Sequence, residues 1–191
     1  LGCLRAGIGW QELLRRADCA HLGKGREPVH DLLYAGFRRQ DVNGTARIDT
    51  QGTLTTTGNG LAWSPDARTL YWTDTPGHTI RAWDWDAASN TLSRPRVFAS
   101  WPGKPAHWQP GLPDNGGYGG RPDGAAVDVD GNYWVAMFEG GRVLQLSPGG
   151  ELLSEWPLPA LCPTMPCFGG ADLRTLYITT ARHGRSADEL A

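Results

Sequence analysis

The sequence lacks several features that would assign a protein to a class at once. It contains no apolar run of about 20 residues, the length that a helix needs to cross a bilayer. Its formal net charge is only −2, so it also lacks the basic excess of proteins that bind nucleic-acid phosphates. We therefore expect neither a membrane nor a nucleic acid as a partner.

Cysteine is scarce as well. The four cysteines form no Cys-x-x-Cys pair and are too few for a secreted disulfide scaffold; they are Cys3, Cys19, Cys162 and Cys167. No signal-peptide pattern is visible ahead of them. We expect reduced, mostly structural cysteines and a cytoplasmic protein.

Glycine and proline, by contrast, are abundant, with 26 and 14 of the 191 residues. Such a composition suits an all-β chain with many tight turns better than a helical one. Residues 1–44 show no blade-like pattern, and we expect them to be irregular or helical, with one short amphipathic helix within 10–22. The regular pattern begins near residue 45 and continues to residue 191.

One pattern occurs three times in that second region. An apolar strand, a turn with Asp and a second strand rich in Leu, Tyr, Trp, Val or Ile occupy residues 58–74, 122–136 and 167–179. Repeated strand units without intervening helices are typical of β-propeller blades. The sequence thus predicts a partial propeller of about three blades.

The strands of these blades can be placed individually. The first complete blade is predicted at 61–63, 69–73, 79–85 and 96–101, and the second at 125–129, 133–138, 143–146 and 152–156. A third blade is expected to start at Cys167 and to reach 177–180. Six tryptophans on strand positions are expected in the core: Trp63, Trp72, Trp83, Trp85, Trp134 and Trp156.

A long segment at 102–122, rich in Pro and Gly, separates the two complete blades. Loops of this length are often lids or binding loops, although a tolerated surface insertion is the plain alternative. Because the segment leads directly into Asp123, we expect it to lie on the same face of the propeller as Asn59.

Asn59 and Asp123 occupy equivalent places at the heads of two inner strands. Inner strands line a propeller's central channel, so oxygen atoms at their heads can converge on one cation. An amide and a carboxylate suit Ca²⁺, Mg²⁺ or Mn²⁺ and are acceptable to Zn²⁺. Asn-Gly and Asp-Gly are also ordinary turn formers, so spacing alone leaves a structural role open.

Several motifs in order strengthen the metal interpretation. They are Asn59-Gly-Leu-Ala-Trp-Ser-Pro-Asp66, Leu70-Tyr-Trp-Thr-Asp74, Arg81-Ala-Trp-Asp-Trp-Asp86, Arg121-Pro-Asp-Gly124, Gly140-Gly-Arg-Val143, Cys167-Phe-Gly-Gly170 and Leu176-Tyr-Ile-Thr-Thr-Ala-Arg182. Together they resemble the senescence-marker-protein/gluconolactonase (regucalcin-like) family over residues 45–191, and they indicate a truncated member.

The resemblance implies a six-bladed propeller that holds one divalent metal ion and hydrolyses sugar lactones. It implies Asn59 and Asp123 as metal ligands, and Asp123 also as the general base that takes a proton from metal-activated water. The family's early Glu ligand has no clean counterpart, because Lys24 stands in its place and Glu27 is displaced. Glu27 is therefore the candidate third ligand.

The substrate expected from the resemblance is a small sugar lactone, and its binding residues are not assigned. Two alternatives stay open at this stage. The chain can be a calcium or other divalent-metal binding protein without significant catalysis, or an inactive propeller fragment. Metal titration and lactone turnover distinguish the three.

Overall fold

The structure is a computed structural model, which describes residues 58–89, 91–109, 117–182 and 185–186. The expected N-terminal segment 1–44, the strands expected between 45 and 57, and Glu27 lie outside these residues. Within the described part every regular element is a β-strand, which confirms the all-β prediction. No helix in that part is long and apolar enough to span a membrane.

The first sheet is a four-stranded antiparallel blade in which each strand pairs with the next along the chain. Its strands are β1 (Gly58–Trp63), β2 (Thr69–Asp74), β3 (Thr79–Asp86) and β4 (Thr91–Ser100). Short turns join them. At the first turn the Ser64 hydroxyl and the Asp66 carboxylate bind backbone amides, which fixes the reversal between β1 and β2.

The second sheet repeats this arrangement, and a third, two-stranded sheet follows. The second contains β5 (Arg121–Val127), β6 (Tyr133–Phe138), β7 (Arg142–Leu146) and β8 (Leu152–Pro157), and the third contains β9 (Pro163–Gly169) and β10 (Thr175–Thr180). All pairs are antiparallel. The predicted partial propeller is confirmed, and the sheets do not close into a ring within the described residues.

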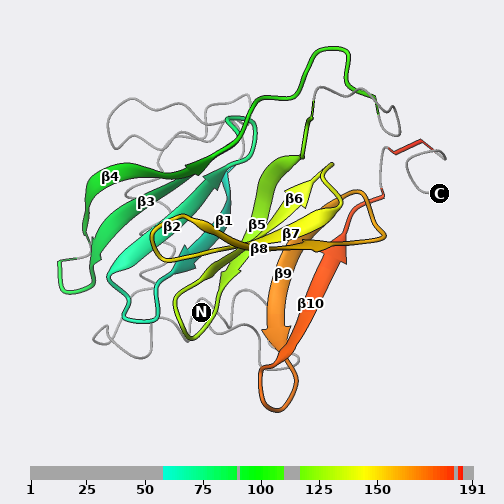
Figure 1. The fold of residues 1–191 in the computed structure, drawn as a ribbon. Coiled ribbons are helices and arrows are strands. Elements are labelled where there is room, and N and C mark those ends of the chain that lie inside the picture. The colour runs from blue at the N-terminus through cyan, green and yellow to red at the C-terminus, as the bar shows by residue number, and fades with distance from the viewer. Residues whose placement is uncertain (1–57, 90, 110–116, 183–184, 187–191) are drawn as a thin grey trace, which may run out of the picture.

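The first strands of the three sheets lie beside one another, with β5 between β1 and β9 (Figure 1). Burial decreases outward from this line. In β5 most residues are buried, whereas β4 and β8, the last strands of the two complete blades, are mostly exposed. This gradient identifies β1, β5 and β9 as the inner strands of the blades.

The main core fills the space between the two complete blades. It combines Ala62, Tyr71, Ile80 and Ala82 of the first with Ala125, Val127, Tyr133, Val135, Met137, Leu144 and Leu146 of the second. Because strand side chains alternate between faces, Leu70 and Trp72 point away from Tyr71. They form a separate cluster with Trp63 and Trp83.

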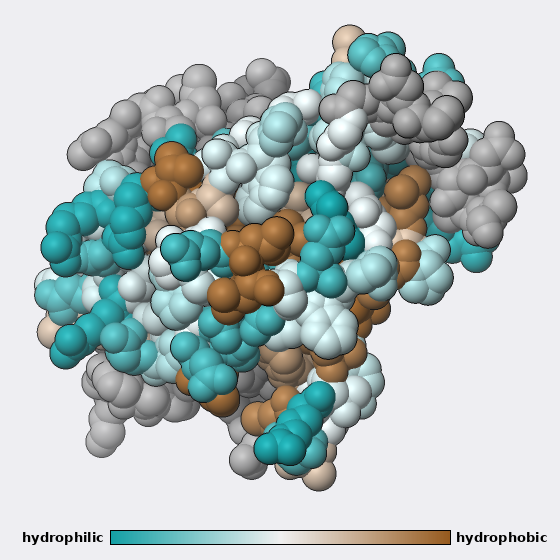
Figure 2. Space-filling view, in the orientation of Figure 1, coloured by the Kyte–Doolittle hydropathy of each residue, from teal (hydrophilic) through white to brown (hydrophobic). Residues whose placement is uncertain are grey.

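The structure corrects three details of the sequence prediction. Trp156 is 52% exposed on the outer strand β8, so it is not a core residue. The third blade begins at Pro163 instead of Cys167, and β4 begins at Thr91 instead of Arg96. Leu152 and Leu153 of β8 are exposed too, and Figure 2 shows apolar side chains near the middle of the visible face, where β8 crosses Figure 1.

Candidate active site

The two predicted ligands come from different blades and meet. Asn59 is the second residue of β1 and Asp123 the third residue of β5. Asn59 Nδ2 donates a hydrogen bond to Asp123 Oδ1 across 64 positions of sequence. Turning the Asn59 amide over would present its oxygen to the same point. The structure therefore brings an amide and a carboxylate together at one end of the inner strands.

A glycine follows each of these residues and permits the close approach. A Cβ on Gly60 would lie 2.8 Å from the main-chain oxygen of Asp123, too close for any side chain. A Cβ on Gly124 would collide in the same way with the main-chain oxygen of Thr164, in β9. Strand pairing is also irregular just after Asn59 and around Asp123. Such bulges re-aim side chains and are frequent beside functional sites.

Tyr133 ties the two blades together directly beneath the site. Its side chain is fully buried, and its hydroxyl donates a 2.6 Å hydrogen bond to the main-chain oxygen of Gly60. The hydroxyl also lies 3.2 Å from Thr73 Oγ1. The ring packs against Tyr71, with centroids 5.1 Å apart. Tyr133 thus fixes the backbone immediately after Asn59.

We expect Tyr133→Phe to lower the free energy of unfolding by about 1–2 kcal/mol, because the buried Gly60 oxygen loses its donor. Thermal or denaturant unfolding measures the change. Tyr71→Phe is the matched control, since the buried Tyr71 side chain makes no hydrogen bond within the described residues. Equal stability losses in both variants would contradict a specific role for the Tyr133 hydroxyl.

The environment of Asp123 favours proton exchange near neutral pH. Burial raises the pKa of Asp123 to about 6, because a partly desolvated carboxylate is less stable than a solvated one. The Arg121 guanidinium, the Thr75 hydroxyl and the Asn59 amide lower this pKa by smaller amounts. Thr75 is 8% exposed, and its Oγ1 completes no hydrogen bond of normal geometry within the described residues. A buried hydroxyl therefore stands beside the carboxyl, available to a ligand.

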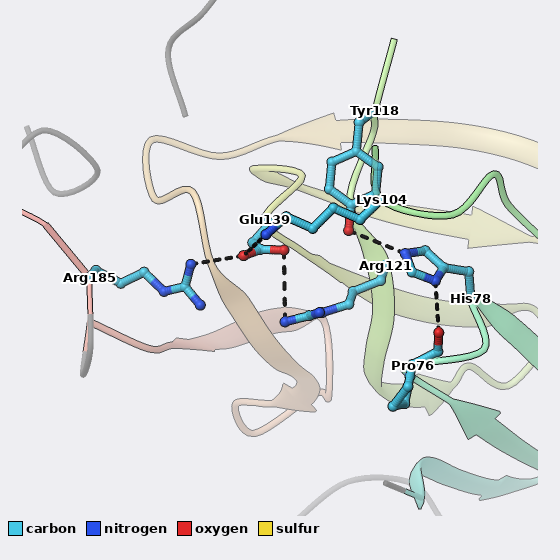
Figure 3. Close-up of polar contacts among 7 residues, drawn as sticks. All are labelled: Pro76, His78, Lys104, Tyr118, Arg121, Glu139 and Arg185. Atoms are coloured by element: carbon cyan, nitrogen blue, oxygen red, sulfur yellow. Dashed lines mark hydrogen bonds and ion pairs between the residues drawn. The ribbon is translucent and has the colours of Figure 1, made fainter. Parts of the chain in front are cut away.

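A second polar cluster, missed by the sequence analysis, includes Arg121, which lies two positions before Asp123 on β5 (Figure 3). Its centre is Glu139, which is 3% exposed in the turn between β6 and β7. Lys104 and Arg185 reach its Oε1 at 2.8 and 2.9 Å, and Arg121 lies 3.7 Å from its Oε2. No local pattern links these residues, which come from four separate segments. The only signal available was Arg121, within the Arg-Pro-Asp-Gly motif.

The long segment before β5 contributes to this cluster from its described portions, 102–109 and 117–120. Lys104 also lies 4.0 Å above the Trp108 ring, and Trp108 packs edge-on against Tyr118. Tyr118 in turn reaches His78 at 3.3 Å. The segment therefore packs against the end of the blades where Asp123 lies, which fits the binding-loop interpretation better than a remote insertion.

Comparison with known proteins gives the chain its family. The model of the SMP-30/gluconolactonase/LRE-like region matches residues 22–182, which is most of the sequence. The chain belongs to this family. The resemblance inferred from the motifs is confirmed.

Individual relatives agree. The chain is 50% identical over 135 residues to the 6-deoxy-6-sulfogluconolactonase of Pseudomonas putida, and 38% identical over 134 residues to the regucalcin of Danio rerio; each match covers 70% of this chain. A solved gluconolactonase from Xanthomonas campestris superposes with a TM-score of 0.50 and 29% identity, covering 72% of this chain and 41% of that one. The chain spans 41% of the length of each of the two curated relatives.

The family implies a divalent metal ion, and the described residues can be tested against it. Asp123 supplies a carboxylate oxygen, the Asn59 amide could supply its oxygen once turned over, and the Thr75 hydroxyl stands beside them. Hard cations prefer such oxygen ligands. No group of three or more His, Cys, Asp or Glu that could hold a metal ion gathers anywhere in the described part of the chain, this site included. The residues present thus fit two positions of a metal shell, and Glu27 lies outside the described residues.

Proposed function

We propose that the protein hydrolyses a sugar lactone, with Asp123 as general base and with Asn59 and Asp123 as ligands of one divalent metal ion. The observation that carries the proposal is the contact of the Asn59 amide with the half-buried carboxyl of Asp123, where the two blades meet. The substrate class is supported by family membership and by relatives named as lactonases.

The reaction needs only water as a second reactant. The water oxygen forms a bond to the lactone carbonyl carbon, the ring carbon–oxygen bond breaks, and the ring oxygen receives a proton to become a hydroxyl. The Asp123 carboxylate accepts the proton that water loses, and its protonated form can return one to the ring oxygen.

A divalent ion, when bound, would supply positive charge that polarises the carbonyl and stabilises the negative charge formed on its oxygen. Asn59 and Asp123 would hold it, with Glu27 as the candidate third ligand. The blades contribute orientation: Tyr133 fixes the backbone at Gly60, so the amide of Asn59 stays opposite Asp123.

The direct test is hydrolysis of a panel of aldonolactones by the purified protein, followed by proton release. We expect turnover above the spontaneous rate, a loss of at least about tenfold after chelation, and recovery with one of Ca²⁺, Mg²⁺, Mn²⁺ or Zn²⁺. The panel should include the sulfonated gluconolactone, since a relative is named for it.

Two other outcomes carry distinct meanings. Stoichiometric metal binding without turnover of any lactone would favour the metal-binding alternative, which the regucalcin relative also supports. Turnover that survives exhaustive chelation would retain the lactonase activity but reject the metal.

A further inference from the structure

Among the described residues, the cluster around Glu139 contains more positive than negative charge. Three cations surround this buried carboxylate, and Lys104 and Arg185 both bind the same oxygen. Burial alone would raise the pKa of Glu139, but hydrogen bonds from Lys104 and Arg185 and the charge of Arg121 together lower it. Glu139 is therefore ionised, and counting Asp123 as well, three cations face two carboxylates.

Arg121 keeps most of its hydrogen-bonding capacity. Its nearest carboxylate oxygen, Glu139 Oε2, lies at 3.7 Å, beyond a normal hydrogen bond. Its side chain makes no hydrogen bond with any other described residue, and its buried Nε has no partner among them. Arg121 packs over the Phe138 ring at 5.0 Å, which restrains the guanidinium. A restrained, unsatisfied guanidinium is suited to an anionic ligand.

The cations are accessible to such a ligand. The side chains of Lys104 and Arg121 are 32% and 29% exposed, and that of Arg185 is 18% exposed. The side chain of Glu139, by contrast, is only 2% exposed. In Figure 3 the three cationic side chains approach Glu139 from different segments. The buried carboxylate thus holds the three cationic side chains in place, and part of each of them remains exposed to solvent.

Arg121 connects this cluster to the reacting site. Arg121 and Asp123 both lie on β5, with only Pro122 between them. The charge of Arg121 acts on both carboxyls, since it lowers the pKa of Asp123 and of Glu139. One end of a small ligand can therefore lie at Asp123 and the other at the cations.

We propose that Lys104, Arg121 and Arg185 form a subsite for a sulfonate or phosphate group on the lactone, remote from its carbonyl. The inference rests on the proposed function, whose substrate it specifies. Three donors from separate segments match the three oxygens of such a group, and charge-assisted bonds are the strong ones in a partly buried site. A neutral lactone gains nothing from this charge.

The kinetic test compares glucono-δ-lactone, its 6-phosphate ester and its 6-sulfo analogue, each corrected for spontaneous hydrolysis. Lys104→Met keeps the aliphatic stem and removes the charge. It should lower kcat/KM for the two anionic lactones by about tenfold or more and leave the neutral lactone within about twofold. Comparing the two anionic substrates shows which group the subsite prefers.

Arg96→Met is the matched control, because Arg96 pairs with Asp84 on the exposed side of the first blade. It removes one positive charge of the protein without touching the cluster, so all three lactones should keep their kcat/KM. A purely structural role for Lys104 would affect neutral and anionic lactones equally. That result, or no effect on either, would overturn the proposal.

A binding experiment separates this inference from the activity itself. Glucose 6-phosphate and the 6-sulfo analogue of glucose keep the ring and the anionic group but have no lactone to hydrolyse. Calorimetry should show at least one of them binding about tenfold or more tightly than glucose, with the difference lost in Lys104→Met. Such binding without lactone turnover would reject the proposed function and keep the subsite. Turnover of the neutral lactone with no preference for anionic ligands would keep the proposed function and reject the subsite.

Discussion

Asp123→Ala is expected to reduce lactone turnover by about 10³-fold or more. The substitution removes the candidate general base and one ionic metal ligand at once, since both roles fall on the same carboxylate. Asp123→Asn keeps the size and one oxygen, so it should retain more metal affinity while still losing the base. Steady-state kinetics at saturating metal, with metal affinity measured separately, distinguishes the two losses.

Asn59→Ala should weaken metal binding by about tenfold and leave measurable turnover at saturating metal, because water can replace one neutral oxygen ligand. Asp130→Ala is the control for the loss of negative charge in Asp123→Ala, since Asp130 is an exposed residue in the turn that follows β5. It should leave turnover unchanged. Near-normal turnover in both Asp123→Ala and Asn59→Ala would show that the reaction takes place elsewhere.

The second large effect is expected from Gly60→Ala, which should lower the free energy of unfolding by about 3 kcal/mol or more. Gly60 has a φ of +55°, where a Cβ is strained, and the added atom would lie 2.6 Å from the Tyr133 hydroxyl and 2.8 Å from the Asp123 oxygen. All of these neighbours are buried or belong to the backbone, so they cannot move away cheaply. The change also displaces Asn59 from Asp123.

Gly131→Ala separates the two causes. Gly131 also has a positive φ, +87°, but its nearest atom to an added Cβ lies at an ordinary 3.4 Å. It should therefore show only the backbone cost, about 1–2 kcal/mol. Chemical denaturation of both variants gives the comparison. Equal destabilisation would mean that the close packing between β1 and β5 contributes nothing.

The strands that the sequence predicted best are those in which local and tertiary requirements agree. The strand at 133–138 was predicted with its observed bounds, because an unbroken apolar run lies between a Gly131 turn and a Gly-Gly turn. The poorest starts, those of β4, β5 and β9, belong to strands that contain proline. Proline argues against a strand interior, but each of these strands has an edge that carries no partner strand within the described residues, and there a missing N–H costs little.

The meeting of Asn59 and Asp123 could also be anticipated, because equivalent positions of repeated blades converge at one end of a propeller. The exposure of Trp156 could not be anticipated, because the sequence pattern of its strand does not show whether another segment covers the strand.

The sequence by itself determined the family, the blade units and the two residues at the heads of the inner strands, because these follow from short-range periodicity and ordered motifs. Only the tertiary structure decided the chemistry around them. The raised pKa of Asp123 comes from burial between two blades, and the cluster of Lys104, Arg121 and Arg185 on Glu139 joins segments up to 81 positions apart, from 104 to 185. Electrostatic interactions act through space and depend on desolvation, and neither distance nor burial is encoded in local spacing.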